Sequence, residues 1–221
     1  MMERAVIRMA AAMLLQYPDR RFAERLPLVE EALIEQPASP AVTGLVEFTA
    51  RCRRRPSAEL AADYVATFDL RRRSTLHLTY YTDGDTRRRG PALARLNRVY
   101  RDAGWLPPTD ELPDHLTVIL EFSAHAPDIG ERILGELRPS VELLRLALAD
   151  SPYAVVLDAV GDTLPACDAA QRDQALLLAE SGPPGEAVGL DPYPRPTSPG
   201  QPRSTVPVAL GMPSSRDGSP R

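Results

Sequence analysis

One stretch, ELPDHLTVILEFSAH at residues 111–125, constrains the fold more than any other part of the chain. Pro113 suits the first turn of a helix, where its missing N–H costs nothing. Asp114 then places a negative charge near the positive end of that helix. The apolar residues that follow cover most of a helix circumference, so the pattern predicts a helix that is buried on several sides.

A single polar stripe interrupts this apolar surface. Asp114, Thr117, Glu121 and His125 recur at helical spacing on one face, and Glu111 extends the line just before the helix. One interpretation is a strip that faces solvent or is satisfied by arginines of the fold. The other is the floor of a groove, where an amphipathic peptide helix lays its apolar side on leucines and aromatics and its basic residues meet these carboxylates.

The rest of the chain also has helical periodicity, and Pro and Gly residues mark the breaks between segments. Residues 76–81 alternate like a strand, but a single strand would have nothing to pair with, so a short helix is predicted there. Gly104 is predicted to end the helix at residues 86–103 as its C′ glycine. The predicted helices cover 2–16, 20–36 (with Pro27 inside), 41–54, 58–68, a short one within 71–86, 86–103, one starting at Pro113, 128–137, 139–149, 153–164 and 169–179.

These segments predict an all-α fold, a single-domain bundle of about eight to ten helices over residues 1–180. The composition changes near Gly182, and 10 of the 23 prolines fall in the last 40 residues. Such a stretch cannot bury enough apolar surface to offset its ordering entropy. Residues 181–221 are therefore expected to be a flexible Pro/Gly/Ser-rich tail.

Composition argues against several functional classes. The net charge of −4 gives no strongly basic surface for general nucleic-acid binding. Three arginine clusters, at 51–55, 71–73 and 87–89, are interpreted mainly as solvated helix ends. They leave one alternative open, a helical regulatory or scaffold protein that binds anions or nucleic acid through these arginines.

No catalytic or metal-binding motif is present in the sequence. It contains neither a P-loop nor a G-x-S-x-G elbow. His77, His115 and His125 do not follow a ligand spacing, and Cys52 and Cys167 form no CxxC pair. We therefore expect no enzyme activity, no metal and no cofactor of the protein's own. The N-terminus lacks a signal-peptide pattern and no apolar run is long enough to span a membrane, so a cytoplasmic protein is expected.

Three motifs in series resemble the nitrate reductase molybdenum-cofactor assembly chaperones, also called delta subunits, which belong to the all-helical redox-enzyme maturation chaperones. The motifs are ELPDHLxxxLEF at 111–122, DYVATFD at 63–69 and LHLTYYTDGDTRRRG at 76–90. The similarity extends from about residue 1 to about residue 194. It implies a cytoplasmic chaperone that binds the apo catalytic (alpha) subunit, notably its N-terminal segment, and keeps it competent for cofactor insertion before it docks on the membrane anchor.

The resemblance also implies where a partner binds. The expected binding residues begin at the start of the central helix, continue along an adjoining groove wall and include one carboxylate of the polar stripe. They are Glu111, Pro113, Asp114 and His115 at the helix start, Tyr64, Phe68, Asp69, His77, Tyr80 and Tyr81 on the wall, and Glu121. Leu116, Leu120 and Phe122 are expected to support the core.

Overall fold

The structure is a computed structural model that describes residues 2–70 and 74–165, together with 169, 171, 173, 175, 177 and 178. Residues 1–186 form one compact unit and residues 187–221 another, and every described residue lies in the first. The expected tail, Cys167 and the arginine cluster at 71–73 lie outside the described residues.

The described residues form α-helices and one π-helix but no β-strand, which confirms the all-α prediction. The elements are α1 (Met2–Leu14), α2 (Arg20–Ile34), α3 (Pro40–Arg54), α4 (Ser57–Tyr64), the π-helix η1 (Val65–Asp69), α5 (Thr79–Asp83), α6 (Arg89–Asp102), α7 (Leu116–His125), α8 (Pro127–Glu136), α9 (Arg138–Ala147) and α10 (Ala154–Thr163).

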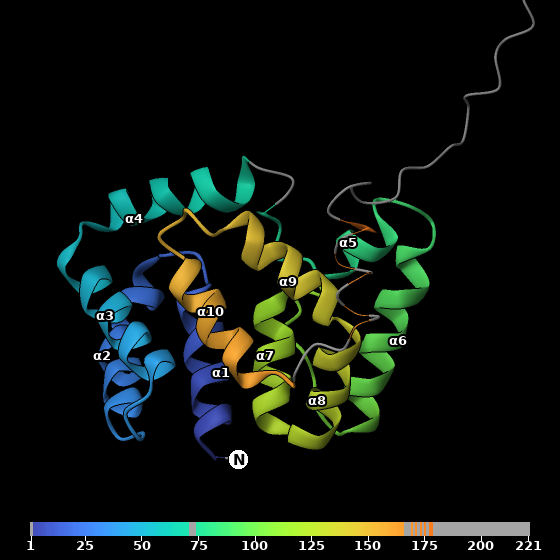
Figure 1. Ribbon diagram of the computed structural model, residues 1–221, viewed down its shortest axis with the longest axis horizontal. Coiled ribbons are helices and arrows are strands. Elements are labelled where there is room, and N and C mark those ends of the chain that lie inside the picture. The colour runs from blue at the N-terminus through green and yellow to red at the C-terminus, as the bar shows by residue number, and fades with distance from the viewer. Residues whose placement is uncertain are drawn as a thin grey trace, which may run out of the picture. The chain divides into compact units, whose positions relative to one another are not determined.

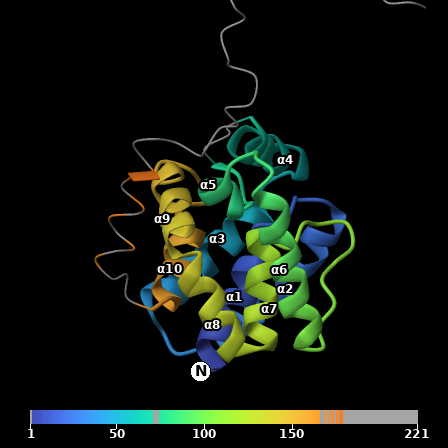
Figure 2. The same cartoon turned by 90° about the vertical axis from the view of Figure 1, so that its right-hand side faces the viewer.

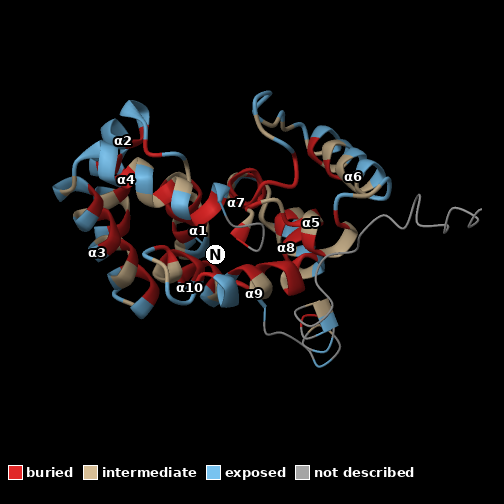
Figure 3. Ribbon diagram, turned by 90° about the horizontal axis from the view of Figure 1, so that it is seen from above, coloured by how far each residue is buried: buried red, intermediate tan, exposed pale blue. Residues whose placement is uncertain are grey.

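Helix α7 lies at the centre of this unit. It packs along α1 on one side and α8 on another, while α10 packs against α3 and α1 (Figure 1). Leu116, Leu120 and Phe122 are fully buried, which confirms their predicted core role. The outward faces of α2 and α6 are exposed, whereas α7 is buried along most of its length (Figure 3). Helix α7 therefore owes its position to tertiary packing more than to its own helix propensity.

Helix α6 lies in front of α7 in the view of Figure 2, and aromatic rings join the two. The Tyr100 ring lies 4.6 Å from the Phe122 ring, and the Tyr100 hydroxyl donates a 2.7 Å hydrogen bond to the Pro113 carbonyl. Gly104 adopts φ 73°, and the Gly104 and Trp105 N–H groups donate to the carbonyls of Arg101 and Tyr100. This is a Schellman C-cap, so the predicted end of this helix is confirmed.

Two local predictions need correction at their boundaries, for one shared reason. Among the described residues of 71–86 the predicted short helix is α5, Thr79–Asp83, and just before it His77 forms an isolated antiparallel β-bridge with His115. The Leu78 N–H donates to the Asp114 carbonyl at 3.0 Å, and the Leu116 N–H donates to the Leu76 carbonyl at 2.8 Å. Because this bridge uses the backbone of 114–116, α7 begins at Leu116 and not at Pro113.

Helices α7 and α8 approach closely at one glycine, which gives a paired test of packing. A Cβ added at Gly130 would overlap the Cα and Cβ of Ser123, whereas one added at Gly135, on the same helix, would meet nothing. We expect Gly130→Ala to lower the free energy of unfolding by about 2 kcal/mol through overpacking. Gly135→Ala should raise it by up to about 1 kcal/mol, because Ala favours a helix more than Gly. Urea denaturation of both variants measures the two effects, and equal changes would contradict the close α7–α8 contact.

Candidate peptide-binding site

A pocket of about 420 Å³ opens where the C-terminal end of α1, the start of α2, α4, and the loop before α7 meet α7 itself. Four of the expected binding residues line it: Tyr64, Glu111, His115 and Glu121. A volume of this size lies within the range of about 300–1,000 Å³ that is typical of ligand sites. The pocket thus lies against the central helix α7 and includes part of the predicted polar stripe.

The carboxylate of Glu121 forms the α7 side of the pocket. Gln16 Nε2 donates to Glu121 Oε1 at 3.3 Å, and Arg25 Nη1 donates to Gln16 Oε1 at 2.7 Å. Burial raises the pKa of Glu121 above its ordinary value and outweighs the opposing effects of the Arg25 charge and the Gln16 hydrogen bond. Among the described residues, no arginine forms a direct ion pair with Glu121, so its charge is only partly compensated.

His115 forms the adjoining part of the wall and is only 8% exposed. Its Nδ1 lies 2.7 Å from the Thr117 hydroxyl, and its Nε2 lies 3.9 Å from Glu111 Oε2. Burial lowers the pKa of His115 to about 4 and outweighs the attraction of Glu111 and Asp114. The imidazole is therefore neutral at neutral pH and can both donate and accept hydrogen bonds.

Asp114 lies elsewhere, in a buried hydrogen-bond cluster, and it is 0% exposed. Its Oδ2 accepts from the Thr79 N–H at 3.3 Å, the Thr79 hydroxyl at 2.5 Å and Arg89 Nη2 at 3.2 Å. Its Oδ1 lies 3.3 Å from His77 Nδ1. The prediction that Asp114 shares one helix face with Glu121 was wrong, because the β-bridge turns Asp114 towards α5 and α6.

The electrostatics of Asp114 reflect this cluster. Burial alone would raise its pKa, but hydrogen bonds from His77 and Thr79 and the charges of His77 and Arg89 outweigh it and hold the pKa at about 2. The carboxylate accepts from the first N–H of α5, so it fixes the start of that short helix. Asp114 therefore stabilises the segments that carry His77 and His115, and it offers no free surface to a partner.

The remaining expected binding residues do not line this pocket. Phe68 is buried in an aromatic cluster, with its ring 4.7 Å from Tyr64 and 4.8 Å from Tyr153. Asp69 is exposed at the end of η1. Phe68 therefore packs against Tyr64 in the core and supports its position.

The residues Tyr80 and Tyr81 lie on α5. Tyr81 is buried and its hydroxyl donates to the Thr75 carbonyl at 3.0 Å, while the half-buried Tyr80 ring lies 6.0 Å from the Tyr81 ring. Pro113 is buried as well, beneath the hydroxyl of Tyr100. The role of these residues in partner binding stays a prediction.

Sequence reasoning missed the opposite wall of the pocket. Arg21 and Arg25 of α2 lie four residues apart and both line the cavity, as do Gln16 and Tyr17 from the end of α1. The i, i+4 spacing of the two arginines on an exposed helix face was a visible signal. Nothing in the sequence, however, shows which later segment α2 faces.

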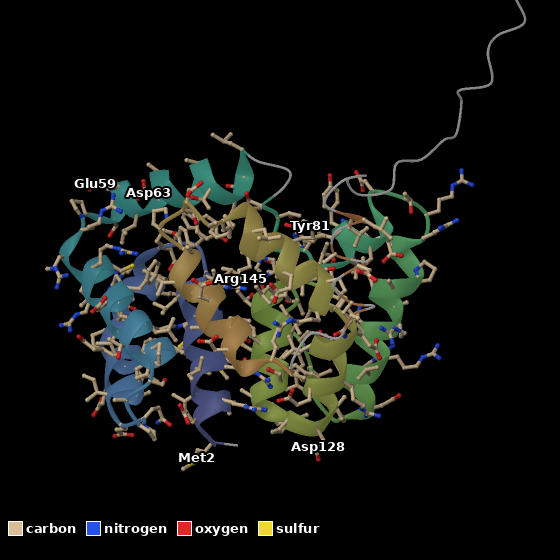
Figure 4. The ribbon with its side chains drawn as sticks, in the orientation of Figure 1. Met2, Glu59, Asp63, Tyr81, Asp128 and Arg145 are labelled. Atoms are coloured by element: carbon tan, nitrogen blue, oxygen red, sulfur yellow. The ribbon has the colours of Figure 1, made fainter. Side chains whose placement is uncertain are left out.

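Three described arginines of the clusters form ion pairs within the fold. Arg53 pairs with Glu30, and Arg55 pairs with both Glu59 and Asp63, which lie along α4 (Figure 4). Arg89 pairs with Asp114. These ion pairs offset part of the positive charge of the clusters.

Among the residues that the structure describes, no group of three or more His, Cys, Asp or Glu side chains is arranged to hold a metal ion. No described helix combines the length and apolar character that crossing a membrane requires.

Comparison with known proteins places the chain. Residues 31–151 match the family model described as nitrate reductase delta subunit. The chain belongs to this family. It is 32% identical over 161 residues to the probable nitrate reductase molybdenum cofactor assembly chaperone NarJ of Bacillus subtilis, a match that covers 70% of this chain and 86% of that protein. It is 31% identical over 151 residues to the chaperone of the same name in Escherichia coli K12, covering 66% and 64%.

A longer relative and a solved structure add to this placement. The chain is 40% identical over 158 residues to the nitrate reductase-like protein NarX of Mycobacterium tuberculosis, covering 70% of this chain but only 24% of that protein, so it spans about a quarter of NarX. A crystal structure from Archaeoglobus fulgidus, described as a redox enzyme maturation protein, aligns with a TM-score of 0.54 over 72% of this chain and 91% of that one, at 19% identity. This last likeness concerns the fold alone.

Proposed function

We propose that this delta-subunit family member is a nitrate reductase molybdenum cofactor assembly chaperone. It binds the apo catalytic (alpha) subunit, mainly through that subunit's N-terminal segment, and holds it competent for cofactor insertion before membrane docking. The relatives named as assembly chaperones support the first part. The pocket beside α7, with the only partly compensated carboxylate of Glu121, is the observation that carries the second.

The pocket has the features that a helical peptide needs. Its carboxylates attract a basic side chain, and partly exposed apolar groups adjoin them, with Tyr17 51% exposed and Leu112 42% exposed. An amphipathic helix can place its apolar face on such groups and its charged residues on the rim. The chaperone role requires only that the apo partner binds more tightly than the mature one, a difference of a few kcal/mol.

The proposal predicts a charge-reversal effect. Glu121→Lys should weaken binding of the catalytic subunit's N-terminal peptide about tenfold, roughly 1.4 kcal/mol, because a cation would replace the carboxylate that attracts the peptide. Glu47→Lys is the matched control, since Glu47 is exposed on α3 and does not line the pocket. Titration calorimetry measures the affinities, and circular dichroism should show the same helical signal for all three proteins.

The outcomes separate two claims. Equal affinities for the wild type and Glu121→Lys would show that the peptide does not bind at this pocket. Absence of any binding by the wild-type protein would refute the proposed recognition of the N-terminal segment.

A further inference from the structure

The two walls of the pocket differ in charge. Arg21 and Arg25 project from successive turns of α2, beside the Asp19 carboxylate that caps this helix, while Asp110, Glu111 and Glu121 come from the loop and from α7. Among the described residues Arg21 forms no ion pair, and Arg25 donates to the neutral amide of Gln16. The pocket is therefore lined by both positively and negatively charged side chains and is not simply acidic.

The fold holds these charges apart. The Gln16 side chain accepts from Arg25 at 2.7 Å and donates to Glu121 at 3.3 Å, so an amide stands between the guanidinium and the carboxylate. Burial still raises the pKa of Glu121 despite the charge of Arg25. Opposite charges that face one cavity without pairing are available to a guest with the complementary arrangement.

His115 adds a hydrogen-bonding nitrogen to the same wall of the pocket. His115 is 8% exposed and its Nδ1 is engaged by the Thr117 hydroxyl. Its Nε2 lies on the Glu111 side, 3.9 Å from that carboxylate, which is beyond hydrogen-bond distance. Among the described residues no hydrogen bond reaches Nε2, so a ligand side chain in the pocket has access to this nitrogen.

We propose that this pocket recognises a dipolar helical segment. A basic side chain of the segment faces Glu111 and Glu121, and an acidic side chain one helical turn away faces Arg21 and Arg25. This inference rests on the proposed function and adds the charge order of the segment. The α2 arginines then weaken the binding of segments that carry basic residues alone, because such segments would bring like charges together.

Two synthetic helical peptides that differ at one position test the inference. The first carries Arg and Glu at positions i and i+4, and the second carries Arg and Gln. Wild-type protein should bind the Arg/Glu peptide more tightly. Arg21→Glu should weaken the Arg/Glu peptide about tenfold, roughly 1.4 kcal/mol, and should tighten the Arg/Gln peptide. Arg20→Glu is the matched control, since Arg20 is the adjacent residue of α2, pairs with Glu24 and does not line the pocket.

Titration calorimetry distinguishes the results. If Arg21→Glu tightens both peptides, or if the wild type binds the two equally, the dipolar inference is overturned. If neither synthetic peptide binds the wild type but the catalytic subunit's N-terminal peptide does, the inference fails and the proposed function stands. If none of the three peptides binds, both fail.

Discussion

Replacing Asp114 with Asn is expected to lower the free energy of unfolding by about 3 kcal/mol. The substitution keeps the size of the side chain but removes a fully buried charge that pairs with Arg89 and His77. Removing one partner of a buried ion pair typically costs about 3–5 kcal/mol, because the other charge stays buried without compensation. Urea denaturation at neutral pH measures the loss. Asp102→Asn, an exposed site on α6, should change it by less than about 0.5 kcal/mol.

The stability lost in Asp114→Asn should depend on pH in a defined direction. The pKa of Asp114 is lowered from 3.8 to about 2 in the folded protein, so the unfolded chain takes up this proton first as the pH falls. The stability that the carboxylate contributes is complete above about pH 4 and is lost towards pH 2. The difference between wild type and Asp114→Asn should therefore narrow across this window. A difference that stays constant would contradict the proposed ion pairs.

The second large effect is expected for Arg8→Ala, again about 3 kcal/mol of lost stability. Arg8 is 2% exposed in α1 and joins two other helices. Its Nη2 donates to Glu131 of α8 and to the Thr163 carbonyl of α10, each at 2.8 Å, and its Nε donates to the Thr163 hydroxyl at 3.1 Å. Truncation leaves a carboxylate and a buried carbonyl without their donor.

The chain offers a close control one turn away. Arg4 also approaches Glu131, at 3.8 Å, but its side chain is 57% exposed. Exposed ion pairs contribute about 0–1 kcal/mol, so Arg4→Ala should change stability only slightly. Both arginines line one pocket together with Glu131 and Asp128, the latter labelled in Figure 4. Equal losses for the two variants would show that Arg8 acts through general surface charge and not through its buried bonds.

The sequence predicted the helices well where local signals decide them. Asp19 accepts from the Phe22 N–H and Ser39 accepts from the Val42 N–H, so each caps the helix that follows it. Pro139 lies in the first turn of α9 and separates that helix from α8. These signals act over a few residues, and the chain carries them without reference to its tertiary structure.

The predictions that were wrong concern residues that meet over long distances in the sequence. The alternation at Leu76–Leu78 was visible, but its partner lies at Asp114–Leu116, and periodicity alone cannot identify such a pair. The same pairing placed Asp114 in the interior. For the pocket, the motif residues Glu111, His115 and Glu121 were found, whereas Arg21 and Arg25 were not, because only the packed structure brings α2 opposite α7.

The position of Trp105 has a practical consequence. It is the single tryptophan of the chain, and its ring lies 5.2 Å from the Tyr100 ring and 5.4 Å from the Phe122 ring. It stands at the beginning of the loop that continues to Asp110 and Glu111. Any displacement of this loop would alter the surroundings of the only indole, so its fluorescence serves as an intrinsic optical reporter of events at the pocket, without an attached dye.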